Sequence, residues 1–199
     1  MKQDKIIKVA FIGDNGVGKT MLFMRINNLL KNKNDYKNKE SFISQKEQLL
    51  TTTNNGCLIQ EKEIILENKE KYVLEIWDIS NTQKTIRFNR FPITRKFYFS
   101  EKSQILIFFI EPNNKKILEN TKMLYEINKT KADINAVYLL CITKNDLNYP
   151  KEDIDDVFKF SKDNNLEIIF TSSFSDNCGL NDDVFRKLIN KYNKISKNE

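Results

Sequence analysis

Eight consecutive residues near the start of the chain have the types and spacing of a loop that binds phosphate groups. Their sequence is Gly13-Asp14-Asn15-Gly16-Val17-Gly18-Lys19-Thr20, which fits G-x-x-x-x-G-K-[ST]. Three of the chain's five glycines lie here, and glycine lets successive backbone N–H groups point at phosphate oxygens. Lys19 would then reach the β- and γ-phosphates of a nucleotide, and the Thr20 hydroxyl would bind Mg²⁺. An ordinary glycine turn is the alternative interpretation.

The elements expected on either side of this loop suit that chemistry. Residues 6–12 are mainly apolar and predict a short buried strand, and residues 21–30 predict a helix. The positive end of the helix dipole would face the phosphates, with Met21 in the first turn among the expected nucleotide contacts. A strand, a glycine-rich loop and a helix in this order give the context in which the pattern predicts phosphate binding.

A second polar loop predicts which base is bound. Thr143-Lys144-Asn145-Asp146 follows residues 137–142, an apolar run that predicts a buried strand. The Asp146 carboxylate can accept hydrogen bonds from the N1–H and the exocyclic amine of guanine together. Adenine has no such pair of donors and would leave the carboxylate unpaired. The stem of Lys144 would lie along the base. Taken alone, these four residues also suit an ordinary surface turn.

A third polar loop, Thr171-Ser172-Ser173, follows residues 166–170, which predict another short strand. Backbone N–H groups in this loop could donate to the O6 atom of guanine. Because ligands of parallel α/β sheets bind at the carboxyl ends of the strands, we expect all three loops to face one ligand.

The remaining pattern predicts an α/β fold. Further strands are expected at residues 57–65, 71–77 and 104–110, and further helices at 115–129, from Pro150 onward and at 181–194. In the helix after Pro150, apolar spacing places Ile154, Val157, Phe158 and Ser161 on the inner face. Alternating strands and helices imply a mostly parallel sheet covered on both sides.

Composition narrows the function classes. The chain has 199 residues, which suits one domain, and a net charge of +6 that is spread along it. It contains no histidine, which excludes imidazole catalysis and histidine metal sites. Its three cysteines, at positions 57, 141 and 178, form no C-x-x-C motif and suggest reduced thiols in a cytosolic protein.

Residues 79–103 are rich in basic and aromatic side chains and could be interpreted as a surface that stacks single-stranded nucleic acid. Pro92 and the lack of a second such cluster favour a loop with a short helix instead. We therefore expect no nucleic-acid partner.

Taken together, these motifs resemble the Ras superfamily of small GTPases, and within it most closely the Rab group. The resemblance rests on residues 13–19, Leu74-Glu75-Ile76-Trp77-Asp78, Tyr98-Phe99, and the loops at 143–146 and 171–173. It implies a P-loop NTPase fold of the small G-protein type, with a mostly parallel six-stranded sheet and helices on both faces. It also implies one domain over residues 1–199, GTP or GDP and Mg²⁺ as ligands, and a role in vesicle or protein transport.

The resemblance assigns roles to further residues. Thr53 would be the first-switch threonine that binds Mg²⁺ and senses the γ-phosphate, with Thr51 and Thr52 as rivals. Asp78 would hold Mg²⁺ through water. GTP would order both switch loops and hydrolysis would release them. Effectors, an exchange factor and a GTPase-activating protein would bind the switch regions of a monomer.

The second switch departs from the family pattern Asp-x-x-Gly-Gln. Asn81 replaces the glycine, Thr82 replaces the glutamine that orients the attacking water, and Gln83 stands one place late. Losing one positioned transition-state contact costs about 2.7–4 kcal/mol, so we expect slow hydrolysis. Gln83 could shift register and rescue it, and Asn15 could crowd the same water. The residues expected to act in hydrolysis are Lys19, Thr53, Thr82 and Gln83.

The first switch region and the last residues of the chain also depart from the family pattern. Residues 31–50, rich in Lys and Asn, look like an insertion in the first switch, and Asn54-Asn55-Gly56-Cys57-Leu58 replaces the usual Rab stretch. Residues 195–199 hold no cysteine for a prenyl group. Either the C-terminus is truncated or the chain docks through other proteins. We expect a cytoplasmic chain with no lipid anchor that contacts membranes indirectly, through partner proteins.

Three functional hypotheses follow from these observations. The first is a GTP-hydrolysing switch, and the second is a nucleotide-locked or nucleotide-free scaffold in a protein complex, which Asn81 and Thr82 favour. The third, an ATP-using kinase or ATPase, is disfavoured by Thr143-Lys144-Asn145-Asp146.

Overall fold

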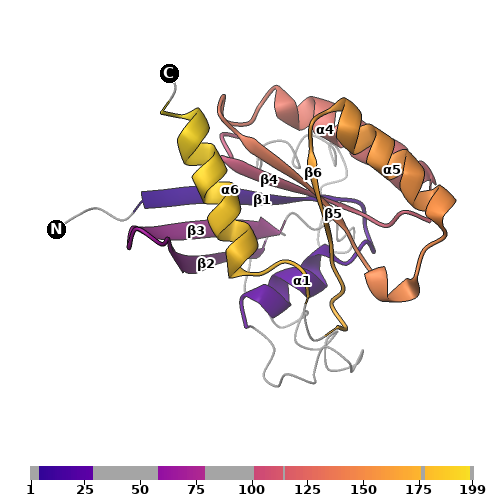
Figure 1. Cartoon of the computed structure of the whole chain (residues 1–199), viewed down its shortest axis with the longest axis horizontal. Coiled ribbons are helices and arrows are strands. Elements are labelled where there is room, and N and C mark those ends of the chain that lie inside the picture. Colours follow the sequence, from indigo (N-terminus) through magenta and orange to yellow (C-terminus); the bar gives the residue numbers. More distant parts are fainter. Residues whose placement is uncertain (1–4, 29–57, 79–100, 114, 176–177, 198–199) are drawn as a thin grey trace, which may run out of the picture.

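The computed structural model of the chain describes residues 5–28, 58–78, 101–113, 115–175 and 178–197 (Figure 1). These residues form one sheet with helices packed against it. None of the helices in these ranges has the length and apolar composition needed to cross a membrane.

The sheet contains six strands in the order β2-β3-β1-β4-β5-β6. The strands are β1 (Lys5–Gly13), β2 (Leu58–Ile65), β3 (Lys71–Asp78), β4 (Ile105–Ile110), β5 (Val137–Ile142) and β6 (Glu167–Phe170). Among the strands that the structure describes, only β2 and β3 pair in the antiparallel sense, through a turn closed by a 2.9 Å hydrogen bond from the Leu66 N–H to the Glu70 carbonyl. The predicted mostly parallel, six-stranded sheet is therefore confirmed.

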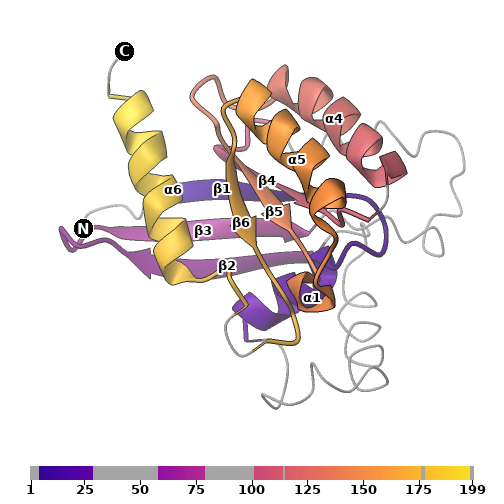
Figure 2. The same cartoon turned by 45° about the vertical axis from the view of Figure 1, so that its right-hand side comes forward.

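Helices cover both faces of this sheet, as Figures 1 and 2 show from two directions. They are α1 (Lys19–Ile26), α4 (Lys115–Lys129), the short 3₁₀ helix η3 (Asn145–Leu147), α5 (Lys151–Asp163) and α6 (Asp182–Ile195). Phe23 of α1 and Phe185 of α6 belong to one core cluster, whereas Leu124 of α4 and Phe160 of α5 belong to another. Strand β4 is buried along its whole length between them, which explains its unbroken apolar sequence.

Two details of the predicted helices were wrong. The helix expected to run to residue 30 ends at Ile26, because Asn28 adopts a left-handed φ of 52° and the Asn27 side chain bonds back to the Phe23 carbonyl. In α5, Phe158 is 46% exposed and Phe160 is buried in its place. The Phe158 ring instead lies 6.2 Å from the Phe170 ring, centroid to centroid, at the edge of the sheet.

The strand register brings several loops to one edge of the sheet. Gly13 at the end of β1 pairs with Phe109 of β4, and Ile142 at the end of β5 pairs with both Ile110 and Phe170. The parallel strands β1, β4, β5 and β6 thus all end at this edge, and the loops that follow them start side by side.

Candidate functional site

The loop after β1 has the backbone geometry of a phosphate cradle. Gly13 has a φ of 151°, and a Cβ atom there would lie only 2.5 Å from the Phe109 carbonyl oxygen, so no larger residue fits. Gly18 has a left-handed φ of 98° and caps α1, which begins at the next residue. The loop therefore passes directly into the amino end of a helix, where backbone N–H groups and the helix dipole favour anions.

Lys19 places a positive charge inside this loop. The residue is 4% exposed, and its Nζ donates to the carbonyl oxygens of Gly13 at 2.8 Å and Asp14 at 2.6 Å. Thr20, also buried, follows in the first turn of α1. A buried ammonium beside a helix amino end suits the terminal phosphates of a nucleotide.

The other residues of the loop differ in what they offer. Asn15 and Gly16 are exposed at its tip, whereas Val17 is fully buried in the core, so only its backbone can face a ligand. Met21 is partly exposed on α1. The Asp14 carboxylate is fixed from α4, because the Asn120 Nδ2 donates to its Oδ2 at 2.6 Å. The sequence carried no signal for this contact with Asn120.

Asp78 and Thr20 form the described part of the expected magnesium site. Asp78 is the last residue of β3, is fully buried, and pairs in register with Phe11 on β1, two residues before the phosphate loop. In the described ranges no group of three or more His, Cys, Asp or Glu residues could hold a metal alone. One hydroxyl and one carboxylate fit Mg²⁺, which takes oxygen ligands and usually completes its shell with water and substrate phosphates.

The two loops expected to contact the base lie against each other. The Asn145 N–H donates to the Thr171 carbonyl at 3.0 Å, and the Thr143 hydroxyl donates to the Ile110 carbonyl at 3.1 Å. Lys144 has a left-handed φ of 54°, and its Nζ forms a 2.6 Å ion pair with Glu111 after β4. Glu111, which the sequence reasoning missed, therefore holds Lys144 in place.

Asp146 and Ser172 connect these loops through their side chains. The Ser172 hydroxyl donates to the Asp146 Oδ1 at 2.5 Å and accepts from the N–H groups of Phe174 and Ser175. Ser172 is buried, as are Thr171 and Ser173, but Asp146 is exposed. The arrangement fixes one carboxylate oxygen and leaves the residue accessible at the surface.

Two titratable groups near these loops have raised pKa values. Burial raises the pKa of the Cys141 thiol to about 12, although a 3.2 Å hydrogen bond with the Thr171 hydroxyl lowers it in part. Burial raises the pKa of the Tyr149 hydroxyl, and the nearby carboxylates of Glu111 and Asp146 raise it further. Both groups therefore stay protonated at neutral pH and are unsuited to act as bases there.

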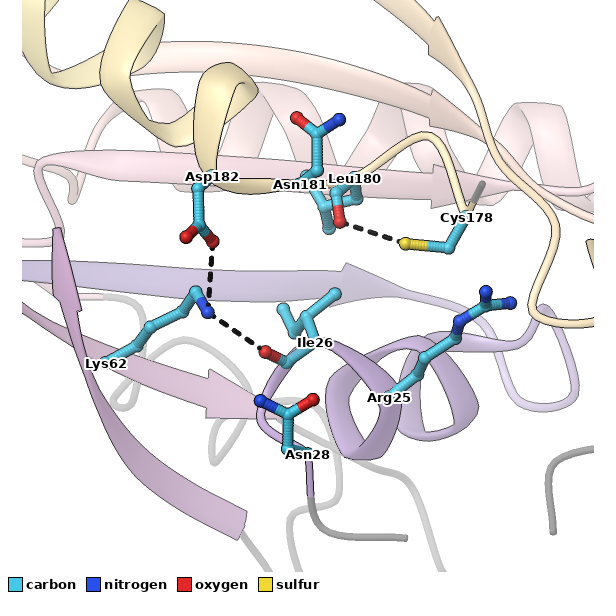
Figure 3. Close-up of a pocket in the computed structure, with 8 residues that line it drawn as sticks. All are labelled: Arg25, Ile26, Asn28, Lys62, Cys178, Leu180, Asn181 and Asp182. Atoms are coloured by element: carbon cyan, nitrogen blue, oxygen red, sulfur yellow. Dashed lines mark hydrogen bonds and ion pairs between the residues drawn. The ribbon is translucent and has the colours of Figure 1, made fainter. Parts of the chain in front are cut away.

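A separate cavity of about 350 Å³ lies between the end of α1, strand β2 and the residues that lead into α6 (Figure 3). Its lining residues are Arg25, Ile26, Asn28, Lys62, Cys178, Leu180, Asn181 and Asp182. The Lys62 Nζ spans it, bonding the Asp182 carboxylate at 3.0 Å and the Ile26 carbonyl at 3.1 Å. None of the residues predicted from the sequence to bind nucleotide lines this cavity.

Several predicted residues lie outside the described ranges. They are Thr51, Thr52, Thr53, Asn81, Thr82 and Gln83. The roles assigned to the two switches therefore stay predictions. Within the described ranges, the structure brings the phosphate loop, Asp78 and the two base loops to the same edge of the sheet.

Comparison with family models matches residues 8–146 to the domain described as "Ras of Complex, Roc, domain of DAPkinase". The match covers more than half of the chain and runs from β1 to Asp146, so it includes the phosphate loop and the first base loop. A search of curated proteins gave no significant match.

Proposed function

The chain belongs to the Roc family of Ras-like GTPase domains, a family of GTP-binding switches, and we propose that it binds GTP and GDP with Mg²⁺ through the edge described above. The observation that carries this proposal is the contact between the two base loops, at the same sheet edge as the phosphate loop. The Ser172 hydroxyl bonds Asp146 at 2.5 Å, and the Asn145 N–H bonds Thr171 at 3.0 Å.

In this proposal the phosphate end is held by backbone and charge. The N–H groups of residues 14–20 and the Lys19 ammonium bind the phosphates, supported by the amino end of α1. The Thr20 hydroxyl and the Asp78 carboxylate bind Mg²⁺, which neutralises charge on the β- and γ-phosphates when it is present.

The base end discriminates by hydrogen bonding. Asp146 accepts from the N1–H and the amine of guanine, and the backbone N–H groups of Ser172 and Ser173 donate to O6. The Thr171 N–H already donates to the Ile142 carbonyl at 2.7 Å. The ion pair with Glu111 holds the Lys144 side chain, whose stem is proposed to lie along the base. Adenine leaves Asp146 without donors, so ATP is the poorer ligand.

Hydrolysis is proposed to be slow. Thr82 replaces the glutamine that orients water in Ras-like GTPases, Asn81 replaces the neighbouring glycine, and Thr53 senses the γ-phosphate. Thr82→Gln should accelerate single-turnover GTP cleavage by about tenfold or more. An unchanged rate would instead make Asn81 or the loop backbone the limiting feature.

The narrower proposal is a Rab-like role in vesicle or protein transport. Two sequence motifs that resemble those of Rab proteins support it. They are Gly-Asp-x-Gly-Val-Gly-Lys at residues 13–19 and Leu74-Glu75-Ile76-Trp77-Asp78. We propose that the chain is one cytoplasmic domain with an insertion at about 31–50, monomeric, and bound by effectors and regulators. Microscopy of the tagged chain tests the location, because a signal absent from the cytoplasm and from vesicle surfaces would contradict it.

The competing proposal is a scaffold that keeps its nucleotide or lacks it, which Asn81 and Thr82 favour. The deciding experiment denatures the purified chain and identifies the released nucleotide by chromatography. GDP supports a working hydrolytic cycle, and GTP supports binding without turnover. A chain that is empty and also refuses added GTP and GDP would refute nucleotide binding and leave the scaffold.

A further inference from the structure

Arg25, in the last turn of α1, contacts the loop that follows β6. Its guanidinium Nη1 donates to the carbonyl oxygen of Ser173 at 2.7 Å and reaches that of Ser172 at 3.4 Å. The contact joins positions 148 and 147 residues apart in the sequence. Both serines are buried, and Arg25 is half-buried at the border of the cavity drawn in Figure 3.

The contact makes α1 a link between the two ends of the proposed nucleotide site. The helix has eight residues and starts with Lys19 and Thr20 at the phosphate end. Its last turn carries Arg25, which bonds the base loop. Because a helix of this length is rigid, the guanidinium fixes the base loop relative to the phosphate loop.

The loop that follows β6 also anchors the side chain of Asp146, which belongs to the loop after β5. The Ser172 backbone carbonyl lies near Arg25, while the Ser172 hydroxyl donates to the Asp146 carboxylate at 2.5 Å. A displacement of this backbone would therefore move the N–H groups proposed to meet O6 and the side chain that anchors Asp146. A planar guanidinium suits this task, because its fixed donors can serve two neighbouring carbonyls.

We propose that Arg25 is a positioning residue for guanine recognition, which acts by holding the Ser172–Ser173 backbone against the O6 side of the base. The inference rests on the proposed nucleotide function and adds a residue that determines base specificity. Arg25 itself contacts the protein backbone of the loop, so its effect on the ligand passes through the loop's N–H groups.

The test uses the full chain and measures competition of GDP and 6-thio-GDP against a fluorescent GDP. The sulfur of 6-thio-GDP replaces O6 and accepts hydrogen bonds weakly, while the N1–H and the amine are kept. In the wild type, GDP should compete better than 6-thio-GDP. Arg25→Gln should lower the affinity for GDP by about tenfold and the affinity for 6-thio-GDP much less, so the ratio of the two affinities becomes smaller.

Two further variants make the result specific. Arg25→Lys keeps a charged donor and should restore part of the ratio. Arg186→Gln is the matched control, because the Arg186 Nε also donates to a backbone carbonyl, that of Ile65, at 3.0 Å. Ile65 lies at the end of β2 opposite to the Leu58–Asp78 pair, so this control should leave both affinities unchanged.

Several results would overturn the proposal. If Arg25→Gln weakens the binding of both nucleotides equally, Arg25 contributes only to the general stability of the site. If both affinities are unchanged, Arg25 has no role in binding. If Arg25→Gln does not fold by circular dichroism, Arg25→Lys decides, because equal weakening of both nucleotides by this variant would refute positioning. A wild type that binds GDP without preferring it to 6-thio-GDP also refutes the inference, whereas a wild type that binds neither refutes the nucleotide function itself.

Discussion

Asp146→Asn tests the base assignment most directly, because the structure separates what the substitution keeps from what it removes. Asparagine keeps an acceptor at Oδ1, where the Ser172 hydroxyl donates at 2.5 Å, so the loop should stay in place. It replaces the second carboxylate oxygen with an amide N–H₂ group. That group would face the exocyclic amine of guanine donor to donor, whereas xanthine offers an oxygen at the same position.

The magnitude follows from the two hydrogen bonds proposed for Asp146. Hydrogen bonds to a charged group contribute about 1.5–3 kcal/mol each. The substitution removes one of these hydrogen bonds and leaves the other with a neutral acceptor. The binding free energy of GDP should therefore weaken by about 3 kcal/mol, which is roughly a hundredfold in the dissociation constant. Because Asp146 is exposed, the free energy of unfolding should change by less than about 1 kcal/mol.

The assay compares GDP and xanthosine diphosphate by competition against fluorescent analogues of both. Asp155→Asn, at an exposed position of α5, is the matched control and should keep the wild-type preference. An Asp146→Asn chain that folds normally and still prefers guanine would refute the reasoning, because the loop would then not read the base.

Three further predictions concern side chains around these loops. Glu111→Gln removes the 2.6 Å ion pair with Lys144. It should lower the free energy of unfolding, measured by urea denaturation, by about 1 kcal/mol and should speed GDP dissociation. If neither quantity changes, Glu111 does not hold Lys144 as described. Cys141, buried and with a pKa of about 12, should resist iodoacetamide at pH 8 until the chain unfolds, and labelling of its peptide in the folded chain would contradict this. The Tyr149 hydroxyl is buried without a hydrogen-bond partner among the residues described, so Tyr149→Phe should stabilise by up to about 1 kcal/mol. Since the folded-state pKa of Tyr149 is raised, wild-type stability should fall as pH rises past 10.0, and the variant should lose less; a variant that is destabilised at pH 7 would refute this account.

Local sequence was enough to predict most of the fold. Strands β4 and β5 were predictable from their apolar runs, and α6 from its periodic apolar face. Burial of residues along a single element leaves a pattern of apolar residues in its own sequence. The phosphate loop was predictable for the same reason, because its glycines and Lys19 lie within eight consecutive positions. Alternating strands and helices then predicted a mostly parallel sheet. The strand order β2-β3-β1-β4-β5-β6 came only from the structure.

The errors arose where neighbouring elements decided the outcome. Helical spacing predicted Phe158 on the inner face, but packing against the sheet and α4 buried Phe160 instead. The end of α1 depended on Asn28 adopting a left-handed conformation, which the apolar pattern through Leu30 does not record.

The sequence by itself determined the sheet, the phosphate loop and the identity of the residues offered to a base. Only the tertiary structure decided how these loops are held. The Arg25–Ser173, Asn120–Asp14 and Glu111–Lys144 contacts join positions 148, 106 and 33 residues apart. Their residue types are ordinary at exposed helix and loop positions, so no local pattern marks them. Pairing over such distances is set by the register of the sheet, which brings the ends of β1, β4, β5 and β6 to one edge.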